Sequence, residues 1–133
     1  MNGEDHLFHG LTQEVLALAF KVQNRLGPGL LESAYEACLV HELRQAGFTV
    51  ASQVPIDIKY DDTLVLHNAY RMDMVVNETL VLELKALEKL LPAHEAQLFT
   101  YLRFSLLPVG LLLNFWAWPL KEGGIKRVIL PEK

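Results

Sequence analysis

Three charged side chains interrupt a segment that otherwise has the pattern of two buried β-strands. Asp73 lies in the first apolar run, and Glu83 and Lys85 lie two residues apart in the second. Because side chains alternate along a strand, Glu83 and Lys85 point to the same face of the sheet. Two carboxylates suit a hard divalent cation, Mg²⁺ or Mn²⁺, which polarises a phosphate and activates a water. In such chemistry the lysine positions that water or stabilises the developing charge.

The turn between the two strands decides whether Asp73 joins the other two groups. A three-residue loop at 77–79 pairs Val76 with Leu80 and sets Asp73 opposite Glu83. A two-residue loop would pair Asp73 with Leu82 and send the carboxylates to opposite faces. The three-residue loop also gathers one apolar face, which consists of Met72, Met74, Val76, Leu80, Leu82 and Leu84. We therefore predict the three-residue loop.

A purely structural explanation competes with the metal site. Buried charges are costly unless they are paired, and a buried acid–lysine ion pair would also satisfy them. The D…E-x-K pattern is short, so in an arbitrary chain the ion pair would be the commoner explanation. Its position on two adjacent buried strands makes the metal site an equally good hypothesis.

The surrounding elements predict a mixed α/β layer fold. Apolar residues at helical spacing alternate with strand-like runs, and glycine or proline punctuates them. The predicted order is ααββββαββ. The helices lie at 12–26 (capped by Thr12), 30–46 and 92–105, and the strands at 54–59, 64–66, 70–76, 80–85, 109–115 and 126–130. We predict a flexible tail at 1–10 and a single domain at 11–133.

Composition narrows the class of protein. The 133 residues are 51% hydrophobic and 21% charged, as in a globular domain. The single cysteine, Cys38, forms no internal disulfide, so we expect a reduced, cytoplasmic setting. The N-terminus does not resemble a signal peptide, and the apolar stretch at 106–118 is shorter than the roughly 20 residues of a membrane span. We therefore expect no membrane segment, while the small size and long apolar strands are compatible with a homodimer.

Several motifs in this order resemble a known group of proteins. The segment from Gly27 to Tyr35, GPGLLESAY, is similar to the signature of the GxxExxY protein family, which resembles the PD-(D/E)XK nuclease superfamily. Asp73 with Glu83-Leu-Lys85 resembles the D…E-x-K core of that superfamily. The similarity extends from about residue 11 to 130. It implies a restriction-endonuclease-like fold, in which helices flank a mixed sheet. One position differs, since the family often has a histidine where this chain has Gln23.

The resemblance implies roles for four catalytic residues. Asp73 and Glu83 would be the main metal ligands, and Lys85 the catalytic lysine. Glu32 would be the acid from an early helix that reaches the metal directly or through water. The implied cofactor is Mg²⁺ or Mn²⁺.

The resemblance also implies contacts to substrate. Gln97 and Tyr101 match the Q-x-x-x-Y helix motif of the exonuclease-like branches, and their four-residue spacing sets them on one helix face. They would orient the lysine or contact a substrate phosphate. Tyr35 is either a further substrate contact or a core aromatic. The pair Trp116 and Trp118 either stacks on bases or lies under a loop or at a dimer contact.

Three hypotheses for the function follow. The first is a Mg²⁺-dependent phosphodiesterase, a nuclease that acts on DNA or RNA. The alternative is a catalytically inactive protein of the same fold that binds nucleic acid or a protein partner. The third is a dimeric interaction module whose acids are only ion-paired. The net charge of −4 argues against tight binding of nucleic acid by charge alone. We therefore expect nucleic acid as a weakly held partner.

Overall fold

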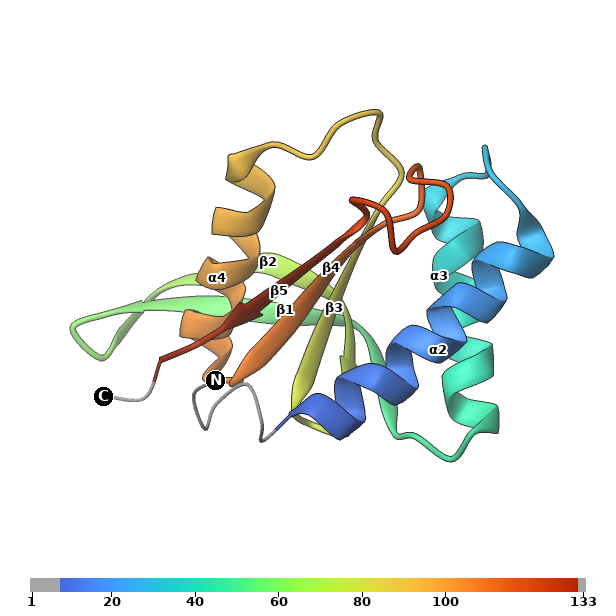
Figure 1. Ribbon diagram of the computed structural model, residues 1–133. Helices are drawn as coiled ribbons and strands as arrows, with labels where there is room; N and C mark the ends of the chain where they lie inside the picture. The colour runs from blue at the N-terminus through green and yellow to red at the C-terminus, as the bar shows by residue number, and fades with distance from the viewer. Residues whose placement is uncertain (1–7, 132–133) are drawn as a thin grey trace.

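A five-stranded mixed sheet organises residues 8–131, the part of the chain that the computed structural model describes (Figure 1). Its helices and strands follow in chain order. They are α2 (His9–Leu26), α3 (Glu32–Gln45), β1 (Val50–Tyr60), β2 (Thr63–Val76), β3 (Leu80–Lys85), α4 (Pro92–Ser105), β4 (Val109–Asn114) and β5 (Ile125–Ile129).

The strands lie in the order β1-β2-β3-β4-β5, and only the central pair β3–β4 is parallel in this sheet. The helix α4 connects these two parallel strands, as such a crossover requires. It packs on one face of the sheet, while α2 and α3 pack together on the other (Figure 1). The predicted α/β class, with helices flanking a mixed sheet, is therefore confirmed.

Both N-terminal helices begin at residues other than those predicted. α2 begins at His9 rather than at Thr12, and the Thr12 hydroxyl donates to the carbonyls of Phe8 and His9, each at 3.0 Å, instead of capping the helix. α3 begins at Glu32, two residues after the predicted Leu30. The first seven residues of the predicted tail lie outside the described residues.

The two strands predicted at 64–66 and 70–76 form one continuous strand, β2, so the observed order is ααβββαββ. The reason is an irregularity that stays within the hairpin. Ile56 pairs with Tyr70 and Ile58 pairs with Leu66, and the extra residues of β2 bulge between these pairs. Asp57 Oδ1 accepts a hydrogen bond from the amide of Asn68 at 2.8 Å, which holds the bulge in place of a break.

The turn between β2 and β3 has the predicted register. Val76 pairs with Leu80 and Met74 pairs with Leu82 across the three-residue turn. Of the predicted apolar face, every residue except Met72 belongs to the buried cluster against α2 and α3. Met72 packs instead in the cluster against α4. Between the pairs Ser52–Met74 and Val54–Met72, Gln53 has a positive φ of 54°.

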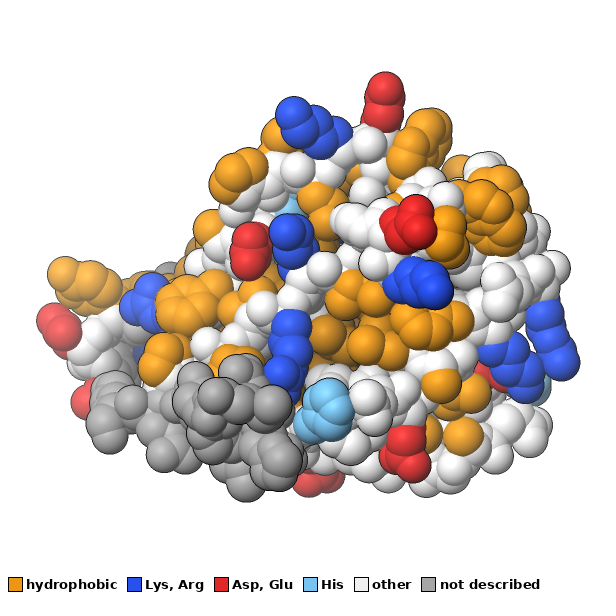
Figure 2. All heavy atoms as spheres, in the orientation of Figure 1, with side chains coloured by type: hydrophobic (Ala, Val, Ile, Leu, Met, Phe, Trp, Pro, Cys, Tyr) orange, Lys and Arg blue, Asp and Glu red, His pale blue; other side chains and the backbone are white. Residues whose placement is uncertain are grey.

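Some large apolar side chains stay outside both buried clusters. Trp116 and Trp118, in the connection between β4 and β5, are about half exposed, and Leu31 is 77% exposed. Figure 2 shows hydrophobic side chains at the surface over this connection and the start of α3. Within residues 8–131, no helix combines the length and apolar character needed to cross a membrane.

Candidate functional site

The carboxylates of Asp73 and Glu83 lie where β2 and β3 stop pairing in the regular way. The last regular pair is Met74 with Leu82. Beyond it, the amide of Asp73 donates to Glu83 Oε1 at 2.9 Å, and the amide of Leu84 donates to Asp73 Oδ2 at 2.8 Å. Each acid therefore replaces a backbone acceptor of the neighbouring strand. We call this opening between the strands the fork.

Burial destabilises the charged form of both acids at the fork. Glu83 is only 5% exposed, and burial, reinforced by the charge of Asp73, raises its pKa to about 8. Burial also raises the pKa of Asp73, although the hydrogen bond from the Leu84 amide opposes the shift. The fork thus holds two adjacent acids whose charged forms are both destabilised by burial.

Lys85 and Glu32 approach the same place from two elements. Lys85 ends β3 and is half-buried, and its positive charge lowers the pKa of Glu32, Asp73 and Glu83. Burial outweighs this effect at Glu32, the first residue of α3, and raises its pKa. Lys85 nevertheless forms no direct ion pair with any acid among residues 8–131. The acids and the amine are thus close enough to interact, yet they do not neutralise one another in a salt bridge.

Two residues that the sequence analysis missed also face the site. Gln53 Nε2 donates to Glu36 Oε1 at 2.8 Å, and the Gln53 side chain also lowers the pKa of Asp73 by hydrogen bonding. Burial and the charge of Asp73 raise the pKa of Glu36. Glu36 lies four residues after Glu32 on the same helix, so helical spacing could have revealed it. Gln53 reaches the site through its unusual backbone, which no sequence pattern announced.

A comparison with protein families gives one match. The model of the PD-(D/E)XK nuclease superfamily matches residues 9–128. The chain belongs to the PD-(D/E)XK nuclease superfamily. Comparisons with curated proteins and with solved structures found no match. The matched range includes the fork and all three described helices.

The helix α4 brings one of its two motif residues to the acids of this superfamily member. Tyr101 is 6% exposed, and burial, followed by the charges of Glu83 and Asp73, raises its pKa to about 12. Its ring lies 5.5 Å from that of Tyr70 on β2. The side chain of Gln97, one turn earlier, is exposed and makes no hydrogen bond within the described residues. The phenol thus faces the acids, while the amide faces solvent.

Tyr35 has the environment of a core residue in this nuclease fold. It is 1% exposed, and its ring stacks on Phe115 with centroids 4.6 Å apart. Its hydroxyl donates to the carbonyl of Gly27 at 2.7 Å and accepts from the amide of Leu30 at 3.3 Å. Tyr35 therefore holds the Gly-Pro-Gly turn against the sheet. Of the two roles left open for it, the structure favours the core aromatic.

Gln23, the position that differs from the GxxExxY pattern, also has a structural role. It is 2% exposed, its Nε2 donates to the carbonyl of Ala117 at 2.6 Å, and its Oε1 accepts from the amide of Leu120 at 2.7 Å. These bonds attach α2 to the connection between β4 and β5. Gln23 therefore supports a neighbouring loop.

The carboxylates at the fork are the type of ligand that a hard cation binds, but they do not form a complete metal site. Among the described residues, no group of three or more His, Cys, Asp or Glu side chains is close enough together to hold a metal ion. Asp73 and Glu83 nevertheless supply adjacent carboxylates, with Glu32 on the facing helix. Carboxylate oxygens are the ligands that Mg²⁺ and Mn²⁺ prefer, and Mg²⁺ usually keeps several waters. The residues at the fork therefore fit a partly hydrated cation.

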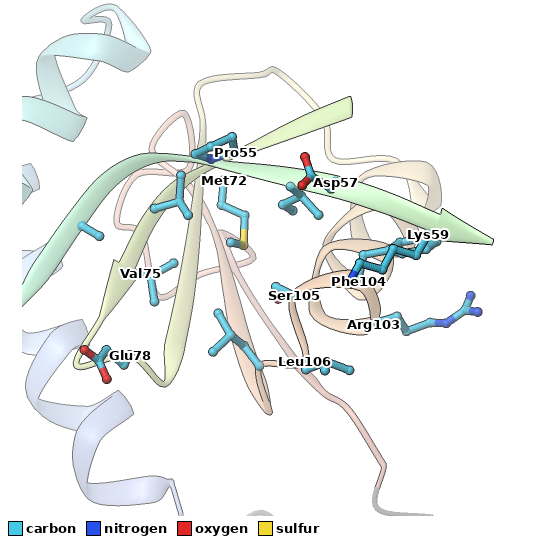
Figure 3. Close-up of a pocket in the computed structure, with 14 residues that line it drawn as sticks. Pro55, Asp57, Lys59, Met72, Val75, Glu78, Arg103, Phe104, Ser105 and Leu106 are labelled. Carbon is cyan, nitrogen blue, oxygen red and sulfur yellow. The ribbon is translucent and has the colours of Figure 1, made fainter. Parts of the chain in front are cut away.

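A large groove lies away from the acids. It has a volume of about 650 Å³ and lies between β1 and the C-terminal end of α4. Figure 3 shows its lining, which includes Pro55, Met72, Phe104 and Leu106. None of the predicted site residues lines this groove. The predicted catalytic residues and the groove thus lie in separate parts of the protein.

Proposed function

We propose that this protein is a divalent-metal-dependent nuclease of the GxxExxY type, which hydrolyses phosphodiester bonds in DNA or RNA. The observation that carries the proposal is the fork, where Asp73 and Glu83 meet with raised pKa values and Lys85 forms no ion pair with any described acid. If these groups served only to stabilise the fold, we would expect a direct ion pair between Lys85 and one of the acids. The start of α3 at Glu32 adds a third acid, as the GxxExxY signature implies.

Asp73 and Glu83 would hold Mg²⁺ or Mn²⁺, and Glu32 would reach the ion directly or through water. When bound, such an ion polarises the phosphate and lowers the pKa of a water molecule. The amides of Asp73 and Leu84 keep one oxygen of each carboxylate in place. Fixed carboxylates need little rearrangement when the cation arrives, which favours binding.

The remaining residues would act on the substrate itself. The ammonium group of Lys85 would stabilise the negative charge that develops on the phosphate oxygens during attack. Tyr101, whose pKa is raised to about 12, stays protonated near neutral pH and would donate a hydrogen bond to a phosphate oxygen. The exposed Gln97, one helical turn away, would contact the next phosphate along the strand.

The decisive test is cleavage of linear DNA, circular DNA and RNA in Mg²⁺ or Mn²⁺. We expect Lys85→Ala to lower the cleavage rate about 10²- to 10³-fold, the usual cost of removing one transition-state donor. Lys59→Ala, at an exposed site in the hairpin, is the matched control and should retain full activity. Cleavage that survives Lys85→Ala equally would assign the activity to a contaminant and end the proposal.

Thermal unfolding separates the alternative function from the proposed one. A cation held at ten times its Kd should add about 1.4 kcal/mol of stability, which would raise Tm by about 3–5 °C. A metal-induced rise in Tm without cleavage would favour the inactive nuclease-fold alternative. If the metal changes neither Tm nor nucleic-acid binding, the acids serve structure alone.

A further inference from the structure

Two half-exposed tryptophans lie in the connection between β4 and β5, residues 115–124. Trp116 is 53% exposed and Trp118 is 52% exposed. They are the only tryptophans in the 133-residue sequence. Large apolar groups that gather at the surface commonly mark a binding site, since water solvates them poorly. The proposed mechanism uses neither side chain.

The backbone that carries these tryptophans is anchored at both ends. Asn114 Oδ1 accepts from the amide of Trp116 at 3.3 Å, and the amide of Ala117 donates to the carbonyl of Asn114 at 3.1 Å. Buried Gln23 bonds to Ala117 and Leu120 on either side of Trp118. The indoles are therefore presented from a backbone that is already ordered, so binding a ligand would cost little conformational entropy.

This connection begins at the end of β4, next to Lys85, the last residue of β3. Lys85 pairs with Asn114, and the amide of Phe115 donates to the carbonyl of Lys85 at 2.8 Å. Phe115 in turn stacks on Tyr35, which lies one turn after Glu32 on α3. The tryptophans thus follow directly on strand residues that flank the fork.

Charge contributes little beside the tryptophans. Lys121 is exposed in the same connection, but the exposed Glu122 follows it directly, so the aromatic faces are the main feature of this surface. In Figure 2 both basic and acidic side chains lie beside the hydrophobic surface over this connection. A stable protein partner would bury about 800 Å² on this chain, far more than two indoles supply. A strand with flat bases fits this surface better.

We propose that Trp116 and Trp118 form a stacking platform for unpaired nucleobases, so that the substrate enters the fork as a single strand or a frayed end. The proposal rests on the proposed function and specifies the substrate class of that same site. Unpaired bases expose the faces that stack on an indole, whereas a duplex hides them. Stacking also compensates for the weak electrostatic attraction of a chain with a net charge of −4.

Intrinsic fluorescence tests the platform directly, because the whole tryptophan signal comes from these two residues. The protein is titrated without divalent metal, so that binding is measured in the absence of cleavage. The titrants are a single-stranded oligonucleotide, a blunt duplex of equal length and an abasic strand. We expect strong quenching by the single strand and little by the other two. Equal quenching by all three, or none, would overturn the platform.

Labelled single strands then measure affinity by fluorescence anisotropy. Trp116→Ala and Trp118→Ala should each weaken binding about 5- to 150-fold. Trp116→Phe and Trp118→Phe should recover most of it, which guards against misfolding of the loop. Tyr60→Ala, at a 71% exposed aromatic in the hairpin, is the control and should bind normally. Unchanged affinity in the alanine variants, or conversion of a dimer to a monomer by them, would refute the platform.

The two proposals fail in different ways. If single strands bind through the tryptophans but no substrate is cleaved with metal, the platform stands and the nuclease is wrong. If substrate is cleaved with dependence on Lys85 but without dependence on Trp116 or Trp118, the nuclease stands and the platform is wrong.

Discussion

Two aspartates on the same β1–β2 hairpin have opposite electrostatic environments. Asp57 is near the groove, where the amide of Asn68 and the imidazole of His67, at 2.9 Å, lower its pKa. Asp73 is at the fork, where burial raises its pKa. Asp57 is an acid whose charge is satisfied locally, as structural acids usually are. Asp73 also accepts a hydrogen bond, from the Leu84 amide, but burial outweighs this effect on its pKa, which marks it as a candidate for catalysis.

The same contrast separates the groove from the fork. The groove beside β1 is roomy and mostly apolar, and the predicted catalytic residues lie elsewhere. The fork concentrates buried acids and Lys85 between two strands. The candidate site therefore follows from the chemistry of its residues and not from the size of a cavity. Three substitutions test this contrast.

The largest expected effect is on catalysis at the fork. Asn can still accept the Leu84 amide, but it lacks the charge that holds a cation. We expect Asp73→Asn to reduce cleavage at least about 10²-fold with little change in Tm. Asp57→Asn makes the same chemical change near the groove and should leave the cleavage rate within about twofold. Equal losses in both variants, measured on the same substrate, would remove the contrast.

A smaller effect concerns the pH dependence of stability. Glu83 has a pKa of about 8 in the folded protein and an ordinary value of 4.5. Between pH 4.5 and pH 8 the folded protein keeps the Glu83 proton, whereas the unfolded chain has lost it. The free energy of unfolding therefore decreases as the pH rises through this range. We expect Glu83→Gln, which cannot ionise, to raise Tm above that of the wild type by about 3–5 °C near pH 9. Near pH 5 the two proteins should unfold at similar temperatures.

The measurement is thermal unfolding in chelator, so that no divalent cation contributes. Glu88→Gln, at an exposed position just after β3, is the control and should follow the wild type at every pH. A wild-type Tm that stays level between pH 5 and pH 9 would mean that Glu83 is better solvated than its burial indicates.

The smallest effect is expected at the groove. Leu106 follows α4 with a φ of 59° and is 82% exposed, a conformation that disfavours side chains with a Cβ. Leu106→Gly should stabilise the protein by about 0.5–1 kcal/mol, or roughly 2–4 °C in Tm, and leave cleavage unchanged. A large loss of cleavage in this variant would show that the groove takes part in the function.

Much of the fold could be predicted because its signals are local. Pro92 correctly predicted the start of α4, and the three-residue turn at 77–79 correctly predicted the pairing of Val76 with Leu80. The predictions failed where tertiary contacts decided the outcome. The side chain of Asp57 holds a bulge that joins two predicted strands into β2. A second failure was local: the Thr12 hydroxyl bonds back to the carbonyls of Phe8 and His9, and α2 begins one turn earlier than predicted.

By itself, the sequence determined which chemistry is available: an acid on one strand, an acid and an amine two residues apart on the next, and a turn length that sets the acids opposite each other. Only the tertiary structure decided that the acids insert between β2 and β3 and that Gln53 and Glu36 lie beside them. It also decided that Tyr35 and Gln23 have structural roles. The physical reason is that alternation and spacing are properties of neighbouring residues. Desolvation and hydrogen bonding depend on groups that are distant in the chain and meet only when it folds.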